Sequence, residues 1–222
     1  MAARSVCPAL LFGENPGNHV RATDVEWRGG RLRFVVDRHR YELPAPARHY
    51  LTSALAALTV AREIGMETTE IAEGFRNFAV TPGRCRVETV GRWTVIDDTY
   101  NASPLSMQAA CECLRSWPAT GKKLLVIGDM LELGSESARW HSELGTLAAT
   151  SGIDWLLTVG DYAPEVARGA RLAGFPAHQI AAFHQIEPLQ SILDCWLSPG
   201  DVVLVKGSRG MRMERVVEWL RT

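Results

Sequence analysis

The stretch Ile96-Asp97-Asp98-Thr99-Tyr100-Asn101-Ala102-Ser103-Pro104 decides the fold. The apolar residues before it indicate a buried strand, and Ser103-Pro104 is typical of a helix start, because serine caps free N–H groups and proline suits the first helical position. Carboxylates, a phenol and an amide therefore emerge together between a strand and a helix. Ligands of open α/β sheets bind at the carboxyl ends of strands. The stretch predicts a ligand-binding edge.

Strand and helix patterns alternate from residue 93 onward. Short, almost wholly apolar runs predict strands at 95–96, 124–127, 155–159 and 202–205, and helical spacing predicts helices at 105–114, 142–149, 166–173, 189–196 and 213–220. Such alternation implies parallel strands joined by right-handed crossovers. Residues 88–222 should therefore form an α/β domain, a mostly parallel, Rossmann-like sheet with helices on both faces.

The preceding residues follow another pattern. Apolar and polar residues alternate around Gly29-Gly30, which predicts antiparallel strands between residues 24 and 43, and helical spacing follows at 51–61 and 69–75. Residues 1–87 should form a small α+β unit that ends near Pro82-Gly83. The run 9–13 is typical of an interior strand, so we expect the chain to be the C-terminal piece of a longer protein.

Composition narrows the class of protein. The chain has 222 residues, 46% of them apolar and 22% charged, and a net charge of -1 at pH 7. This balance favours small molecules over nucleic acid or an anionic membrane as partners. Five scattered cysteines indicate reduced thiols, and no run reaches the ~18 apolar residues of a membrane span. We expect a soluble, cytoplasmic monomer.

Several common motifs are missing. No G-x-G-x-x-G follows the predicted strands, and Gly121-Lys122-Lys123 lacks the upstream glycine and the hydroxyl of a P-loop. Cys111 and Cys113 lack the spacing of a zinc or redox pair, which predicts packing. His141, His178 and His184 are expected on helix surfaces or in loops. No metal site is predicted.

Four places in the chain carry candidate binding residues. Arg84 follows Pro-Gly, where a guanidinium can hold phosphate or ribose oxygens, or can simply be a surface arginine. Asp97 and Asp98 should point to opposite sides, one inward and one toward the cleft, where a carboxylate can accept two ribose hydroxyls. Residues 206–209 open the last helix and could bind an anion, or form a solvated basic loop. His49 could cap a helix or contact a ligand.

At these residues the sequence resembles the Mur ligase family. The similarity runs through nearly the whole chain in the family's order. The matching segments are 12–17, 54–57, Pro82-Gly83-Arg84, 97–104, Gly128-Asp129-Met130-Leu131-Glu132-Leu133-Gly134, 141–145 and 205–214. The segments 97–101 and 128–134 point to the member that adds D-alanyl-D-alanine.

The resemblance implies a three-domain enzyme, of which residues 1–87 would be the back of the central ATPase domain and residues 88–222 the C-terminal domain. In the family, ATP phosphorylates the carboxylate of a UDP-muramoyl-tripeptide, and the amine of D-Ala-D-Ala attacks the acyl phosphate. The P-loop and the magnesium ligands would lie upstream of Met1. The chain alone is therefore expected to hold no catalytic residue, to bind neither ATP nor Mg²⁺, and to be inactive.

Residue roles follow from the same resemblance. Arg84 and Asp98 match contacts to ATP, with Asp98 on the ribose hydroxyls, and Tyr100 and Asn101 share their loop. His49 and Ser53 match the adenine side, although Tyr50 and Ser53 stand where the family usually has asparagines. On the side of the incoming substrate, the matching residues are Lys206, Ser208 and Arg209.

Two alternatives stay open. One is another ligase of the superfamily, such as a tripeptide-recycling ligase or folylpolyglutamate synthetase, against which Tyr100-Asn101 and segment 128–134 count. The other is a binding module that kept the Rossmann-like domain and lost the ATPase, which the absent P-loop favours.

Overall fold

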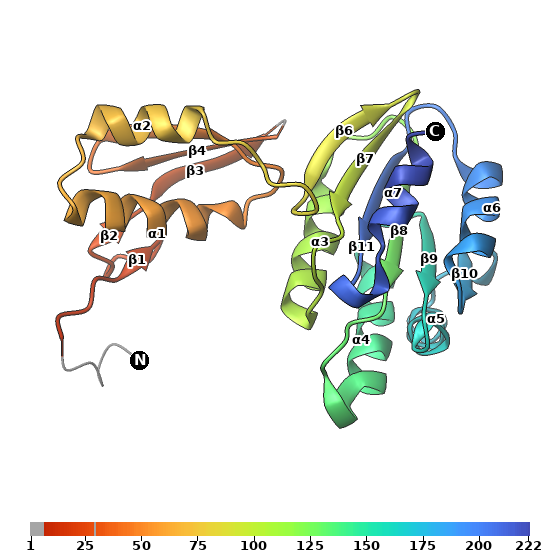
Figure 1. The fold of residues 1–222 in the computed structure, drawn as a ribbon. Coiled ribbons are helices and arrows are strands. Elements are labelled where there is room, and N and C mark those ends of the chain that lie inside the picture. The colour runs from red at the N-terminus through yellow and green to blue at the C-terminus, as the bar shows by residue number, and fades with distance from the viewer. Residues whose placement is uncertain (1–6, 29) are drawn as a thin grey trace. The chain divides into compact units, whose positions relative to one another are not determined.

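The computed structural model describes residues 7–28 and 30–222. The chain divides into two compact units, unit 1 up to Val80 and unit 2 from Thr81 to Thr222 (Figure 1). The expected boundary after residue 87 falls inside strand β6 (Arg86–Val90), which pairs with strand β7 (Trp93–Asp98) of unit 2.

Unit 1 is a small α+β structure. Its antiparallel sheet has the order β3 (Thr23–Arg28), β4 (Arg31–Val36), β5 (His39–Pro44), as the alternation predicted. The short strands β1 (Phe12–Gly13) and β2 (Val20–Arg21) form a separate parallel pair. Both predicted helices are present, as α1 (Tyr50–Glu63) and α2 (Thr68–Arg76).

The core of unit 1 follows from two periodicities. Every second residue of β4 is buried, and so are the residues of α1 at helical spacing. These side chains form one cluster with Tyr41 and Leu43 of β5 and Ile71 of α2. The cluster therefore joins the sheet to both helices.

Unit 2 is an α/β sheet in the order β10-β9-β8-β11-β7-β6, six strands within the described residues 81–222. The strands not yet located are β8 (Lys123–Gly128), β9 (Trp155–Val159), β10 (Ile180–Phe183) and β11 (Val202–Lys206). All neighbours are parallel except β6, which pairs with β7 antiparallel. The predicted mostly parallel sheet is confirmed.

Helices cover both faces of this sheet (Figure 1). One face carries α3 (Pro104–Ser116), α4 (Ser137–Thr150) and α5 (Ala163–Leu172), and the other carries α6 (Ile186–Trp196) and α7 (Glu214–Leu220). Short 3-10 turns lie at Gly134–Glu136, Ala177–Gln179 and Arg209–Met211. Edge strands β6 and β10 escaped prediction because they are short and only partly buried.

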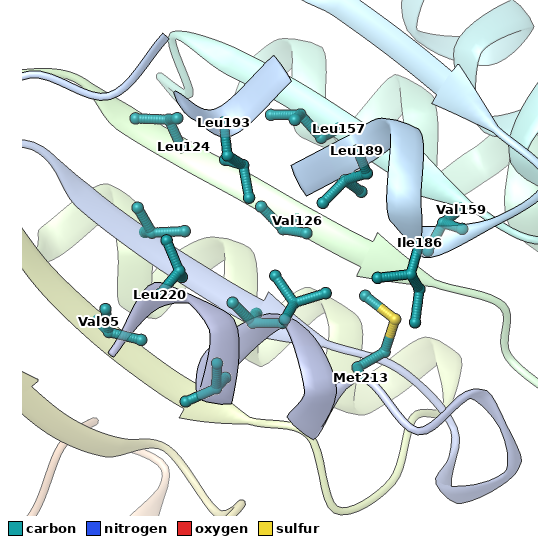
Figure 2. Close-up of a cluster of buried hydrophobic side chains, with 14 residues drawn as sticks. Val95, Leu124, Val126, Leu157, Val159, Ile186, Leu189, Leu193, Met213 and Leu220 are labelled. Carbon is teal, nitrogen blue, oxygen red and sulfur yellow. The ribbon is translucent and has the colours of Figure 1, made fainter. Parts of the chain in front are cut away.

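The core under α6 and α7 fixes the second face. Valines and leucines of the central strands meet Leu189 and Leu193 of α6, and Met213 and Leu220 at α7 (Figure 2). On the first face, α4 and α5 approach at two glycines: a Cβ on Gly145 would lie 2.0 Å from the Val166 carbonyl oxygen. This packing holds the strand ends that carry the candidate site.

Candidate functional site

The helix start predicted at the deciding stretch is confirmed. Ser103 is the N-cap of α3 and its hydroxyl accepts from the backbone N–H of Ser106 at 3.4 Å, while the Ser106 hydroxyl accepts from Ser103 N at 2.9 Å. Pro104 occupies the first turn. Residues 99–103 are therefore a short connection held at both ends, by β7 and by the capped helix.

Asp97 and Asp98 alternate as expected, and Asp97 is the buried one, 5% exposed. Its carboxylate accepts from the Thr99 hydroxyl at 2.6 Å, from Thr99 N at 3.3 Å and from Gly83 N at 3.2 Å. Gly83 has φ +75°, and an added Cβ would lie 3.1 Å from Tyr100 N. Asp97 thus ties the Pro82-Gly83 turn to the loop after β7.

Asp98 faces Lys206, which lies directly opposite it in the parallel pair of β7 and β11. The Lys206 ammonium donates to Asp98 Oδ2 at 2.6 Å and to the Asn101 carbonyl at 2.8 Å, while Cys85 N donates to Asp98 Oδ1 at 3.0 Å. The side chains are 14% exposed for Asp98 and 3% for Lys206. Each Asp98 oxygen therefore has one protein donor and further lone pairs.

Arg84 lies between Gly83, whose backbone N–H donates to Asp97, and Cys85, whose backbone N–H donates to Asp98. Its guanidinium carbon is 4.1 Å from the centroid of the Tyr100 ring, a cation–π contact, and Tyr100 is 45% exposed. Asn101 turns its side-chain oxygen back to Ala102 N, at 2.9 Å. The structure brings together Arg84, Asp98, Tyr100 and Asn101, which the sequence had placed on two separate segments.

Ser208 is buried and braces the neighbouring loops. Its hydroxyl accepts from Leu131 N at 2.8 Å and donates to the Ala102 carbonyl at 3.4 Å, and its own N–H donates to the Asp129 carbonyl at 3.0 Å. Arg209 is exposed, with its guanidinium 3.7 Å from Glu214 Oε1. Of the predicted substrate residues 206, 208 and 209, only Arg209 presents its charge to the surface.

A cavity of about 190 Å³ lies between the loop after β7 and the segment that follows β11. Tyr100 and Arg209 both line it, together with Gly83 and Arg86. The loop after β7 and the loop after β11 thus open onto one space.

His141 is buried, 1% exposed, so the expected surface position is wrong. Its Nε2 accepts from Met130 N at 2.9 Å, its Nδ1 lies 2.7 Å from the Ser137 carbonyl, and its ring stacks on Tyr162 at 4.6 Å. Ser137 lies one helical turn before His141, whereas Met130 and Tyr162 lie outside its helix. No sequence motif predicts these three contacts. His178 and His184 are exposed, as expected.

Asp129 lies beside His141 at the end of β8. It accepts from the backbone N–H of Asp161 at 2.7 Å and of Tyr162 at 3.2 Å. Burial raises the pKa of the Asp129 carboxyl above its ordinary value, although these hydrogen bonds and the nearby His141 oppose the rise. Asp129 and His141 therefore fix the segment 128–134 that the sequence had singled out.

His49 and Ser53 belong to unit 1 and are exposed at the start of α1. His49 is the N-cap residue but makes no side-chain capping hydrogen bond. At a spacing of four residues the two side chains share one face of the helix. Their predicted contact with adenine stays a prediction.

Residues 7–28 and 30–222 contain neither a cluster of metal-ligating side chains nor a membrane-spanning helix. Within those ranges no group of three or more His, Cys, Asp or Glu is arranged to hold a metal ion. None of the helices described there is long and apolar enough to cross a membrane.

Comparison with known proteins matches the part of the chain that contains Arg84, Asp98 and Arg209. Residues 83–209 match the family model described as Mur ligase, glutamate ligase domain. The chain is 31% identical to a UDP-N-acetylmuramoyl-tripeptide--D-alanyl-D-alanine ligase of Bacillus subtilis, over 96% of the chain and 47% of that enzyme. The chain thus spans about half the length of the curated relatives it matches.

Solved structures agree with this match. MurF from Acinetobacter baumannii aligns with a TM-score of 0.85 and 27% identity, over 97% of this chain and 48% of that one. MurF ligase from Thermotoga maritima, solved in complex with ADP, aligns with a TM-score of 0.77 and 28% identity, over 96% and 48%.

Proposed function

The chain belongs to the Mur ligase family, and on that premise we propose that it is part of an ATP-dependent ligase that joins D-alanyl-D-alanine to UDP-N-acetylmuramoyl-tripeptide in peptidoglycan precursor synthesis. In this proposal unit 1 belongs to the central ATPase domain and unit 2 is the C-terminal domain. The enzyme acts in the cytoplasm, as a monomer, on small molecules.

One observation carries the proposal: Asp98 and the Arg84–Tyr100 pair lie together at the carboxyl end of β7. The free lone pairs of Asp98 suit ribose hydroxyls, because a carboxylate can accept two hydroxyl hydrogen bonds while it keeps its present donors. The guanidinium of Arg84 lies over the Tyr100 ring, and a planar guanidinium matches the geometry of ribose or phosphate oxygens. Residues 84 and 98 therefore fit a nucleotide.

ATP would supply the phosphoryl group that activates the tripeptide carboxylate. The protein's part in such a reaction is mainly positioning and charge stabilisation. In unit 2 that part falls to Asp98 and Arg84, which orient the nucleotide. Mg²⁺ would accompany the phosphates of ATP.

Arg209 is the proposed contact on the side of the incoming dipeptide. It is exposed at the cavity it shares with Tyr100, and its ion pair with Glu214 is loose, at 3.7 Å. An exposed guanidinium can hold the terminal carboxylate of D-Ala-D-Ala in a bidentate manner. Ser208 would keep Arg209 in place through the loop contacts of its buried hydroxyl.

The test is phosphate release by the complete gene product, with ATP, UDP-muramoyl-tripeptide and D-Ala-D-Ala. We expect release that requires the dipeptide, and a raised KM for ATP in Asp98→Ala. Asp154→Ala is the matched control, since Asp154 is exposed and accepts one hydrogen bond, from Lys123 N at 2.7 Å.

Two results would overturn the proposal. Release that depends on a different amine substrate would assign the chain to another ligase of the family. No release with any amine would favour a non-catalytic binding module. We expect the 222-residue chain alone to release no phosphate.

A further inference from the structure

We infer that Lys206 is a positioning residue of the nucleotide side of the site, acting through Asp98, and not a contact of the incoming dipeptide. This inference rests on the proposed function and assigns to Lys206 a role different from that of its neighbour Arg209. The resemblance to the Mur ligase family placed both residues on the substrate side, because both lie in the short segment that matches the family's side of the incoming substrate.

Burial separates the two cations. The side chain of Lys206 is 3% exposed, whereas that of Arg209 is 68% exposed. The Lys206 ammonium is already held by Asp98 Oδ2 at 2.6 Å and by the Asn101 carbonyl at 2.8 Å. An ammonium has three N–H donors, and two of them have these acceptors inside the protein. A dipeptide carboxylate would have to displace them in a place that solvent hardly reaches.

The choice of lysine at this position is informative. The chain has 21 arginines and three lysines, and the other two, Lys122 and Lys123, lie at the start of β8, at the opposite end of the strands from Lys206. A compact ammonium can donate to a carboxylate oxygen and to a carbonyl oxygen at once, whereas the planar fork of arginine matches both oxygens of a single carboxylate or phosphate. Lys206 therefore matches its two acceptors, Asp98 Oδ2 and the Asn101 carbonyl.

The ion pair reaches Arg84 through the backbone. Asp98 Oδ1 holds Cys85 N at 3.0 Å, and Asp97 Oδ2 holds Gly83 N at 3.2 Å. The residues on both sides of Arg84 are thus fixed by two consecutive carboxylates. Lys206 is the ion-pair partner of Asp98, and removing one member of a largely buried ion pair leaves the other without its compensating charge. Loss of the ammonium should disturb Asp98 directly and Arg84 through Cys85.

The test is a comparison of Michaelis constants in the complete gene product. Lys206→Met should raise the KM for ATP roughly tenfold or more, the loss expected for a charge-assisted contact, and leave the KM for D-Ala-D-Ala within about twofold. Arg209→Met should do the reverse. Lys122→Met, the same change at the opposite end of the strands, should leave both constants unchanged. A purely structural role would lower the active fraction and move neither constant.

A double-mutant cycle with Asp98→Asn covers the case in which Lys206→Met does not fold, because the neutral pair removes the uncompensated charge. If Lys206 acts through Asp98, adding Lys206→Met to Asp98→Asn changes the KM for ATP by less than about twofold. The inference would be overturned if the two substitutions raised the KM for ATP by factors that multiply in the double variant, or if Lys206→Met raised the KM for the dipeptide. Failure of the proposed function is distinct, since it shows as absent dipeptide-dependent release in the unmodified enzyme.

Discussion

Asp97→Ala should be among the most damaging single substitutions in unit 2. The side chain is 5% exposed and accepts three hydrogen bonds, from Gly83 N, Thr99 N and the Thr99 hydroxyl. Alanine would leave two backbone donors and one hydroxyl without acceptors, in residues that are themselves buried. At about 1–3 kcal/mol for each unsatisfied donor, with relief where the hydroxyl turns, the free energy of unfolding should fall by about 3–5 kcal/mol.

Asp97→Asn should cost less. Its remaining oxygen can still accept from Thr99, but its amide would oppose the N–H of Gly83, so one bond is lost and one repulsion is gained. We expect a loss of about 1–3 kcal/mol. Asp154→Ala, the same truncation at an exposed carboxylate with one hydrogen bond, should cost under about 1 kcal/mol.

Tryptophan fluorescence during urea and thermal unfolding measures these changes. Six of the seven tryptophans lie in unit 2, and only Trp27 lies in unit 1, so the signal reports mainly on the domain that carries Asp97. A loss of 3–5 kcal/mol should lower Tm by roughly 10–20 °C for a domain of this size. An Asp97→Ala loss below about 1 kcal/mol, or equal losses for Asn and Ala, would refute this reasoning.

Three further predictions concern packing, thiols and pH. Gly145→Ala should lower the free energy of unfolding by about 3 kcal/mol or more, because its Cβ would lie 2.0 Å from a carbonyl oxygen of α5; an unchanged urea midpoint would contradict this. In a native thiol titration only the exposed Cys7 and Cys195 should react quickly, whereas burial raises the pKa of the Cys111 thiol to about 12 and should delay its reaction until unfolding; a third fast thiol would count against this. Because burial raises the pKa of Asp129 above 3.8, the folded state holds that proton more tightly, so stability should decline as pH rises from about 3.8 through the raised pKa. Urea unfolding between pH 4 and 7 should show that the stability of the unmodified protein falls with rising pH relative to that of Asp129→Asn, and parallel profiles would exclude this contribution.

The parts of the fold that the sequence predicts are those set by local pattern. Apolar runs predicted the buried parallel strands, and apolar residues at helical spacing predicted α1. Ser103-Pro104 predicted the start of α3. The structure confirms all three. The alternation of Asp97 and Asp98 is confirmed as well, because strand geometry alone decides it. Edge strands β6 and β10 carry a weak pattern, since one side of each faces no neighbour.

The partners of buried polar groups could not be predicted in the same way. Lys206 and Asp98 are 108 residues apart in the chain. His141 accepts a hydrogen bond from Met130 N because α4 packs beside the segment that follows β8. Charge and motif indicated that these residues matter. They gave no information on whether a cation points outward to a ligand or inward to a carboxylate, because that depends on the order of strands.

The order of strands explains why one short segment serves several loops. Strand β11 comes last in the chain but lies between β8 and β7. Its last residue, Lys206, therefore reaches the loop after β7, and Ser208, two residues later, touches that loop and the one after β8. Had β11 been added at an edge, each residue could have met one neighbouring loop at most. Central insertion is thus the physical reason that residues 206–209 can hold Asp98 through Lys206 and present Arg209 to the cavity from the same turn.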